Sequence, residues 1–380
     1  MMIPQHILEH NPTPFYAYDL GLLEETLQRC KTAAKRYNFH VHYAFKANVN
    51  DPILELIRDA GFGADCVSGQ EVKKAHDIGF SKDKIVFAGV GKTDAEIETA
   101  LKIGIFCFNC ESLEELEVIN ELAIKQNTIA SIALRINPNV NANTHHYITT
   151  GLDENKFGIN LWELDTVLNR LPELRQLHLI GIHFHIGSQI MDLHVFRSLC
   201  LKVNEFLDIF SSRNIVLDMV NVGGGLGVDY QNPDENPIPD FDAFFEVFHQ
   251  NLNLNQNQSL HFELGRSLVA QCAWLVSQVV FVKRGQHTNF AIIDAGMTEL
   301  LRPALYQSYH KITNVSSQVA VHENYDVVGP ICESSDCFGK GVELPKTKRG
   351  DLLVIHSVGA YGEVMSSNYN MREKANAVYF

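Results

Sequence analysis

A lysine ends a short apolar run near the start of the sequence, within Tyr-Ala-Phe-Lys-Ala-Asn at residues 43–48. An amine at the mouth of a buried strand is partly desolvated, which lowers its pKa and lets it attack an aldehyde. Lys46 is therefore a candidate Schiff-base lysine. Because a lysine beside a strand is more often simply exposed to solvent, the assignment depends on the polar residues that end the other apolar runs.

Further polar residues follow later apolar runs. The glycines of residues 223–227 would let backbone N–H groups approach a phosphate closely, although glycine clusters also form tight turns without a ligand. Glu263 could pair with a protonated ring nitrogen, as electron-sink cofactors require. An isolated carboxylate more often caps a helix or forms a salt bridge. A cofactor-binding role for Glu263 is therefore supported only by the other candidate site residues.

His183 and His185 alternate along the expected strand 179–186, so only one of them can face the interior of a barrel. We assign His185 to a functional site and His183 to the core. A lysine for an aldehyde, a cradle for a phosphate, a carboxylate for a ring nitrogen and a flat imidazole together describe a site for pyridoxal 5′-phosphate.

The composition excludes several classes of partner. The 380 residues carry 45 acidic and 31 basic side chains, a net charge of −14, with no block of Lys or Arg. This balance argues against nucleic acid, and no apolar stretch has the pattern of a signal peptide or a membrane span. Eight cysteines lack zinc-finger spacing, so we expect reduced thiols and no metal site. The sequence predicts a cytoplasmic protein that binds neither nucleic acid nor a membrane.

Short apolar segments alternate with amphipathic segments of helical length. The expected strands are 41–45, 62–67, 84–88, 105–108, 132–136, 179–186, 216–222 and 260–264. The expected helices are 53–60, 70–78, 94–101, 112–123, 162–171, 193–211 and 241–252. The alternation predicts an α/β fold, a (β/α)8 TIM-like barrel over residues 25–266, with chemistry at the C-terminal ends of its strands. Residues 1–24 and 267–380 are expected to form a β-sandwich or β-barrel domain.

The order of the motifs resembles that of one enzyme family. The motifs are YAFKAN (43–48), NPNVNANTHHYITTG with KFGI (137–151 and 156–159), FHIGSQ (184–189), GGGLGVDY (223–230), ELGRS (263–267), DAGMTELLRPALY (294–306), GPICESSD (329–336) and GAYG with SSNYN (359–362 and 366–370). The chain resembles the group IV pyridoxal-phosphate decarboxylases, which have an alanine-racemase-type barrel. Within them it looks like the members that convert meso-2,6-diaminopimelate to L-lysine. Leu264 stands where that family usually has proline.

The resemblance implies a role for each matching residue. Lys46 would bind the cofactor aldehyde, and Cys332 would protonate the carbon that loses carbon dioxide. The cofactor would be held by Lys46, His185, Ser188, Gly225, Glu263, Gly265, Arg266 and Tyr361. The substrate would be held by Arg266, Arg302, Tyr306, Glu333 and Tyr361. In this family the segments around Cys332 and Tyr361 enter the partner's site, so the resemblance also implies a homodimer with shared active sites.

Three other functions remain open at the level of sequence. A sister decarboxylase would act on ornithine, lysine, arginine or carboxynorspermidine, but simple diamino substrates lack the far carboxylate that Arg302 and Tyr306 are suited to bind. A racemase with the same barrel is not expected to contain the CESSD segment at 332–336. A catalytically idle cofactor-binding protein would need neither the long β domain nor Cys332.

Overall fold

The computed structural model describes residues 3–139 and 156–380. The chain divides into two compact units. One unit, here called the barrel unit, comprises Leu27–Gly227 and Asp240–Gly265. The other, here called the β unit, comprises Met1–Thr26, Val228–Pro239 and Arg266–Phe380. Most of the sequence motif at 137–151 lies outside the described residues.

The barrel unit contains a closed parallel barrel in the strand order β2-β3-β4-β5-β6-β7-β8-β9. The strands are β2 (His40–Ala44), β3 (Gly63–Cys66), β4 (Ile85–Phe87), β5 (Cys107–Cys110), β6 (Ala130–Arg135), β7 (Leu177–His183), β8 (Met219–Asn221) and β9 (Ser259–Leu264). Each overlaps one of the eight expected strands. The predicted TIM-like barrel is confirmed, because strands buried on both faces need apolar residues almost throughout.

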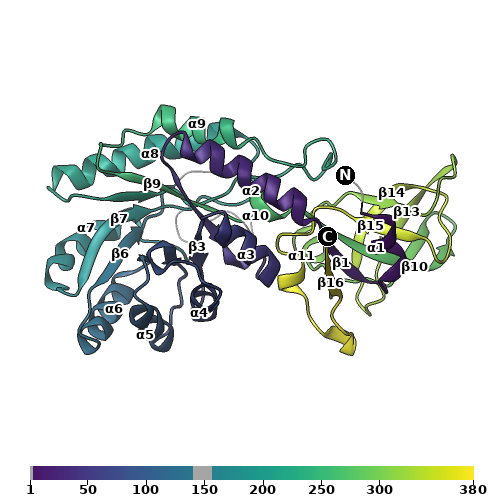
Figure 1. The fold of residues 1–380 in the computed structure, drawn as a ribbon, viewed down its shortest axis with the longest axis horizontal. Helices are drawn as coiled ribbons and strands as arrows, with labels where there is room; N and C mark the ends of the chain where they lie inside the picture. Colours follow the sequence, from purple (N-terminus) through teal and green to yellow (C-terminus); the bar gives the residue numbers. More distant parts are fainter. Residues whose placement is uncertain (1–2, 140–155) are drawn as a thin grey trace. The chain divides into compact units, whose positions relative to one another are not determined.

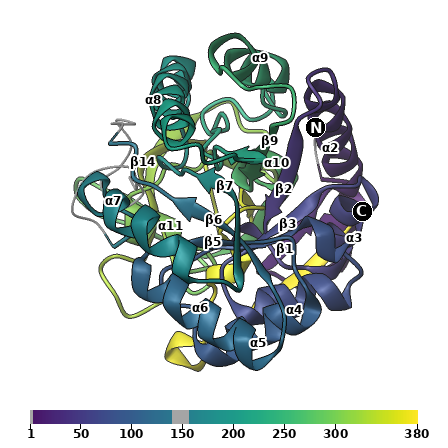
Figure 2. The same cartoon turned by 90° about the vertical axis from the view of Figure 1, so that its left-hand side faces the viewer.

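Helices follow the strands of this barrel and surround them in Figure 2. They are α3 (Asp51–Asp59), α4 (Gly69–Asp77), α5 (Asp94–Ile103), α6 (Leu113–Lys125), α7 (Leu161–Arg170), α8 (Leu193–Ser212) and α9 (Phe241–Asn251), and α2 (Leu20–Lys35) precedes β2. The first turns of α4 and α6 are fixed by side-chain caps. Ser68 Oγ accepts from the Glu71 N–H at 3.2 Å, and Ser112 Oγ accepts from the Glu115 N–H at 3.2 Å. Because such caps satisfy otherwise unpaired N–H groups, they set where each strand-to-helix turn ends.

An aromatic cluster fills the space between β9 and α9. The Phe262 ring lies 4.9 Å from the rings of Phe245 and Phe248 and 5.6 Å from that of Phe244, all in edge-to-face geometry. Phe262 and Phe245 are fully buried. Truncating a buried phenylalanine costs about 3–5 kcal/mol, so this cluster holds β9 firmly in place. The strand that carries Glu263 is therefore a rigid support.

The β unit is built on a mixed eight-stranded sheet, visible in Figure 1 through β10, β13, β14 and β15. Its strands are β1 (Phe15–Tyr18), β10 (Ala273–Arg284), β11 (Asn289–Ile293), β12 (Ile312–Asn314), β13 (His322–Val328), β14 (Cys337–Pro345), β15 (Leu352–Ile355) and β16 (Asn376–Tyr379). The short helices of this unit are α1 (Gln5–His10), α10 (Arg266–Val269) and α11 (Arg302–Tyr306). The expected second, β-rich domain is thereby confirmed. In the described part of the chain, none of the helices has the length and apolar character needed to cross a membrane.

Candidate active site

Lys46 lies in a short 3-10 turn (Phe45–Ala47) directly after β2. Its Nζ is 3.5 Å from Asp65 Oδ2, at the end of the neighbouring strand β3. The Asp65 carboxyl is fully buried, whereas the Lys46 side chain is partly exposed. Burial, followed by the negative charge of Glu263, raises the pKa of Asp65 to about 8, although Lys46 opposes this shift. The lysine thus emerges at the strand ends beside a carboxyl that can hold a proton near neutral pH.

Glu263, near the end of β9, accepts three hydrogen bonds inside the barrel. Its Oε1 accepts from Asn109 Nδ2 at 3.0 Å and from Asn221 Nδ2 at 2.8 Å. Its Oε2 accepts from His183 Nε2 at 2.9 Å. Burial alone would raise the pKa of Glu263, but His183, Lys46 and His185 outweigh burial and lower that pKa below its usual range. The carboxylate therefore stays charged inside the barrel.

His183 and His185 both lie close enough to Glu263 to lower its pKa, contrary to the expectation that only one of them faces the barrel interior. Strand β7 ends at His183, so the period of two does not continue to His185. His183 bonds Glu263 and is not simply a core histidine. Burial, and then the charges of Lys46 and Arg135, lower the pKa of His185 well below its usual value, so its ring is neutral. A neutral flat imidazole fits the stacking role predicted for His185.

The glycine run after β8 passes very close to neighbouring backbone. A Cβ on Gly224 would lie 1.9 Å from the Glu263 carbonyl oxygen, and a Cβ on Gly225 would lie 2.9 Å from that of Gly187. Gly225 also has φ +117°, which side chains rarely adopt. Only glycine fits these positions. Ser188 and Gly265 follow the adjacent strands β7 and β9, so the barrel unit brings together most of the residues predicted to contact a phosphate.

The barrel unit therefore fits pyridoxal phosphate by the chemistry of its residues. Lys46 supplies an amine, and the glycine run follows β8 at the C-terminal strand ends, where backbone N–H groups without side chains can approach a phosphate. Glu263 Oε2 accepts one hydrogen bond from the described residues, and a carboxylate oxygen can accept two. The anion is thus able to take one more donor, such as a protonated ring nitrogen.

The β unit holds two arginines, Arg266 at the start of α10 and Arg302 at the start of α11. Both are buried. Arg266 Cζ lies 5.0 Å from the centre of the Tyr361 ring, and both guanidinium groups lie within 6 Å of the Tyr230 ring, at 5.9 Å for Arg266 and 5.7 Å for Arg302. Tyr306 follows Arg302 by one helical turn. The residues predicted to bind a carboxylate thus lie close together. Tyr230 lies with them, although the sequence did not indicate this role for it.

Cys332 and Glu333 of the β unit contact residues other than the two arginines. Cys332 is exposed, and its N–H donates to Asn370 Oδ1 at 3.2 Å. Glu333 accepts from the Tyr369 hydroxyl at 2.7 Å. Among the described residues, neither side chain bonds to Arg266 or Arg302. The structure therefore does not bring these two predicted site residues to the arginine pair within one chain.

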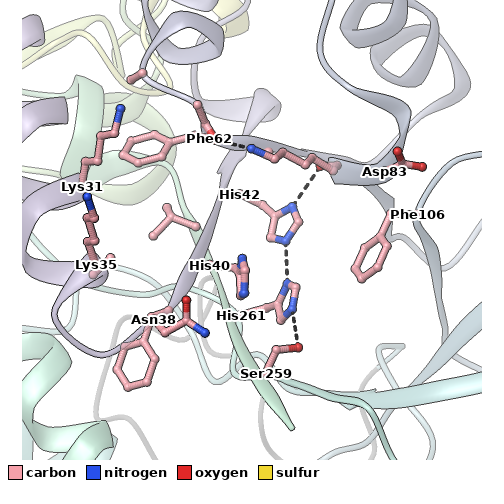
Figure 3. Close-up of a pocket in the computed structure, with 17 residues that line it drawn as sticks. Lys31, Lys35, Asn38, His40, His42, Phe62, Asp83, Phe106, Ser259 and His261 are labelled. Atoms are coloured by element: carbon pink, nitrogen blue, oxygen red, sulfur yellow. Dashed lines mark hydrogen bonds between the residues drawn. The ribbon is translucent and has the colours of Figure 1, made fainter. Parts of the chain in front are cut away.

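A pocket of about 480 Å³ opens at the opposite ends of the barrel strands, and Figure 3 shows its lining. A hydrogen-bonded series crosses it: His42 Nε2 lies 2.9 Å from His261 Nδ1, and His261 Nε2 lies 2.9 Å from Ser259 Oγ. Burial lowers the pKa of His42 to about 4, so this imidazole is neutral at physiological pH. Barrel enzymes carry their chemistry at the C-terminal strand ends, where Lys46 lies, so this pocket is not the candidate active site.

Comparison with known proteins agrees with this geometry. The family model "Pyridoxal-dependent decarboxylase, pyridoxal binding domain" matches residues 20–270. Diaminopimelate decarboxylase of Bacteroides thetaiotaomicron is 55% identical over 95% of this chain and 94% of its own length. The chain belongs to the diaminopimelate decarboxylase family. The family member from Neisseria meningitidis serogroup B is 41% identical over 96% of this chain and 87% of its own length.

The family assignment extends to solved structures. The crystal structure of the Helicobacter pylori diaminopimelate decarboxylase complexed with L-lysine matches with a TM-score of 0.93 and 38% identity. The match covers 99% of this chain and 93% of that one. Like the family, the chain is a pyridoxal-dependent decarboxylase with pyridoxal 5′-phosphate as its cofactor. The predicted family, enzyme class and cofactor are confirmed.

Proposed function

We propose that this enzyme decarboxylates meso-2,6-diaminopimelate to L-lysine and carbon dioxide. The observation that carries the proposal is the buried pair Arg266 and Arg302 in the β unit. This substrate has a second carboxylate that survives the reaction, and planar guanidinium groups bind carboxylates in a defined orientation. Substrates without that group would leave the buried Arg302 cation without an anion, which is costly.

The proposed cofactor roles follow the chemistry of each side chain. Pyridoxal phosphate, when bound, supplies an electron sink for the electrons left by the departing carboxylate. Lys46 would hold its aldehyde, and the anionic Glu263 would keep its ring nitrogen protonated. His185 would cover one ring face. The phosphate would be held by Ser188, Gly225, Gly265 and Arg266, with Tyr361 completing the cofactor site.

The proposed substrate roles separate the two ends of diaminopimelate. Arg266, Arg302 and Tyr306 would bind the carboxylate that is retained, with Tyr361 beside them. Glu333 would bind the distal ammonium group, and the Cys332 thiol would deliver a proton to the carbon that has lost carbon dioxide. Holding the substrate at both ends fixes which bond is aligned for cleavage, an orientation effect that contributes strongly to rate.

The proposal includes a cytoplasmic homodimer with shared sites. Residues 25–266 would form the cofactor-binding domain, and residues 1–24 and 267–380 would contribute to the interface. The exposure of Cys332 supports its action in the partner's site. Mixing inactive Lys46→Ala and Cys332→Ala chains should restore about a quarter of wild-type activity, because half of randomly mixed dimers have one intact site. If the reassociated mixture regains no activity, each site is complete within one chain.

The decisive experiment measures carbon dioxide release by the cofactor-loaded enzyme. Meso-diaminopimelate should react, whereas L-lysine, L-ornithine and L-arginine should give a kcat/KM lower by two or more orders of magnitude, since each lacks the second carboxylate. Comparable release from L-ornithine would instead support a sister decarboxylase. No release from any of the four would contradict the proposed reaction itself.

A further inference from the structure

Tyr230 lies close to both buried arginines of the β unit. Its hydroxyl oxygen accepts a hydrogen bond from Arg266 Nη1 at 2.6 Å. Its ring centre is 5.9 Å from Arg266 Cζ and 5.7 Å from Arg302 Cζ, within the range of cation–π attraction. Burial alone would raise the pKa of Tyr230, but the charges of Arg266 and Arg302 outweigh burial and lower it. One phenol therefore interacts with both guanidinium groups.

His310 supports the second arginine through a fixed tautomer. Its Nδ1 lies 2.9 Å from the His356 carbonyl oxygen, which can only accept, so Nδ1 carries the proton. Burial, and then the charge of Arg302, lower the pKa of His310 to about 3 and keep the ring neutral. Nε2 is therefore an acceptor, and Arg302 Nε donates to it at 3.4 Å. The His310 ring also packs edge-to-face on Tyr230 at 5.0 Å.

The contacts to Arg302 orient a charge that the carboxylates of the described residues leave unbalanced. Within the described part of the chain, no carboxylate forms an ion pair with Arg302. Its guanidinium is oriented by a neutral imidazole and an aromatic ring. A neutral acceptor fixes direction without neutralising the cation, so the attraction for an incoming anion is preserved. A carboxylate in place of Tyr230 or His310 would compete with the substrate.

We propose that Tyr230 and His310 are positioning residues that hold Arg266 and Arg302 ready to bind the substrate carboxylate that survives the reaction. This inference rests on the proposed function. It explains how a long, flexible arginine can select a dicarboxylate, because a pre-oriented guanidinium loses less conformational freedom when the substrate binds. Neither residue needs to contact the reacting carbon.

The test uses cofactor-loaded enzyme and two inhibitors that differ only in this carboxylate. L-Lysine has it, and 1,5-diaminopentane is the same molecule without it. Tyr230→Phe keeps the ring and removes the hydroxyl acceptor. We expect KM for meso-diaminopimelate and Ki for L-lysine to rise about 10- to 100-fold, as for loss of a hydrogen bond to a charged group. The kcat and the Ki for 1,5-diaminopentane should change by less than about threefold.

Matched variants separate positioning from damage. Tyr309→Phe alters an exposed tyrosine next to His310 and should leave all four constants unchanged. His310→Gln places an amide oxygen near the position of Nε2 and should retain tight L-lysine inhibition, whereas His310→Leu should lose it. This pair carries the test if Tyr230→Phe does not fold.

The outcomes are distinct. Equal weakening of both inhibitors, or no weakening of L-lysine inhibition in Tyr230→Phe and His310→Leu, would overturn the positioning role. If wild-type enzyme releases no carbon dioxide from meso-diaminopimelate, the proposed function fails first. In that case L-lysine binding by calorimetry still reports whether the arginine pair depends on Tyr230.

Discussion

Replacing Glu263 by Gln should destabilise the barrel unit as well as impair its chemistry. The wild-type carboxylate accepts from Asn109, Asn221 and His183. An amide has one oxygen, so it can satisfy the two asparagines while its NH2 group faces His183. Two hydrogen-bond donors, the amide NH2 and the His183 Nε2–H, would then face each other. Moving the proton to His183 Nδ1 would not remove this cost. Nδ1 is buried with no hydrogen-bond partner among the described residues, so it would become an unpaired donor.

The size of the effect follows from these contacts. One unpaired buried donor costs about 1–3 kcal/mol, and two hydrogen bonds to a charged acceptor become weaker neutral ones, at about 1 kcal/mol each. Removing the buried charge also removes the cost of burying it, which offsets part of this loss. Because the pKa of Glu263 is lowered despite burial, its surroundings favour the charged form by more than burial disfavours it. We expect a net loss of about 2–4 kcal/mol in the free energy of unfolding at pH 7.

Urea unfolding of the cofactor-free protein, followed by circular dichroism at 222 nm, measures this loss. Glu98→Gln, an exposed change in α5, is the control and should be neutral within about 0.5 kcal/mol. A group with a lowered folded-state pKa stabilises the fold above its unfolded-state pKa and loses that effect as pH falls. The difference between wild type and Glu263→Gln should therefore shrink below about pH 4.5. A variant as stable as wild type at pH 7 would refute the reasoning.

Three further outcomes are expected. Lys46→Ala should lose the absorbance of the cofactor-bound lysine and turnover, and borohydride reduction should label the 43–48 peptide only in wild type; a label elsewhere would contradict the role of Lys46. Arg302→Lys should raise KM for meso-diaminopimelate about 10- to 100-fold more than kcat falls, because a lysine lacks the planar fork; an unchanged KM would exclude Arg302 from substrate binding. Asp65→Asn should raise the melting temperature of the cofactor-free protein. The raised pKa of Asp65, about 8, makes the wild-type fold lose stability between pH 4 and 8, so the gain should grow over that range; a gain independent of pH would contradict this.

The barrel could be predicted because its strands are buried on both faces, so most of them appear in the sequence as predominantly apolar runs. Other elements could not be found so directly. Strand β14 (Cys337–Pro345) contains glycines, a lysine and a glutamate, and its pairing with β13 decides its conformation. Helix α2 (Leu20–Lys35) had a signal that was not used: Leu23, Leu27, Cys30 and Ala34 repeat at helical spacing and are buried.

The candidate site was predictable in its main residues but not in their supports. Lys46 and Glu263 stand at strand ends and carry a chemical signal of their own. Asn109, Asn221 and His183 are separated from Glu263 by 154, 42 and 80 positions, and only the register of the closed barrel brings them to one carboxylate. A neutral amide in a strand does not reveal its partner locally.

The pairing of β1 constrains the order in which the molecule can be completed. Phe15 of this strand pairs with Val276 of β10 and, in parallel, with Asn376 of β16, both far away in the sequence. Its edges stay unpaired during synthesis until β10 and β16 have been made, whereas most barrel strands can meet their neighbours earlier. Newly synthesised chains would then expose unpaired strand edges for a time. Protection by chaperones matters most at this stage.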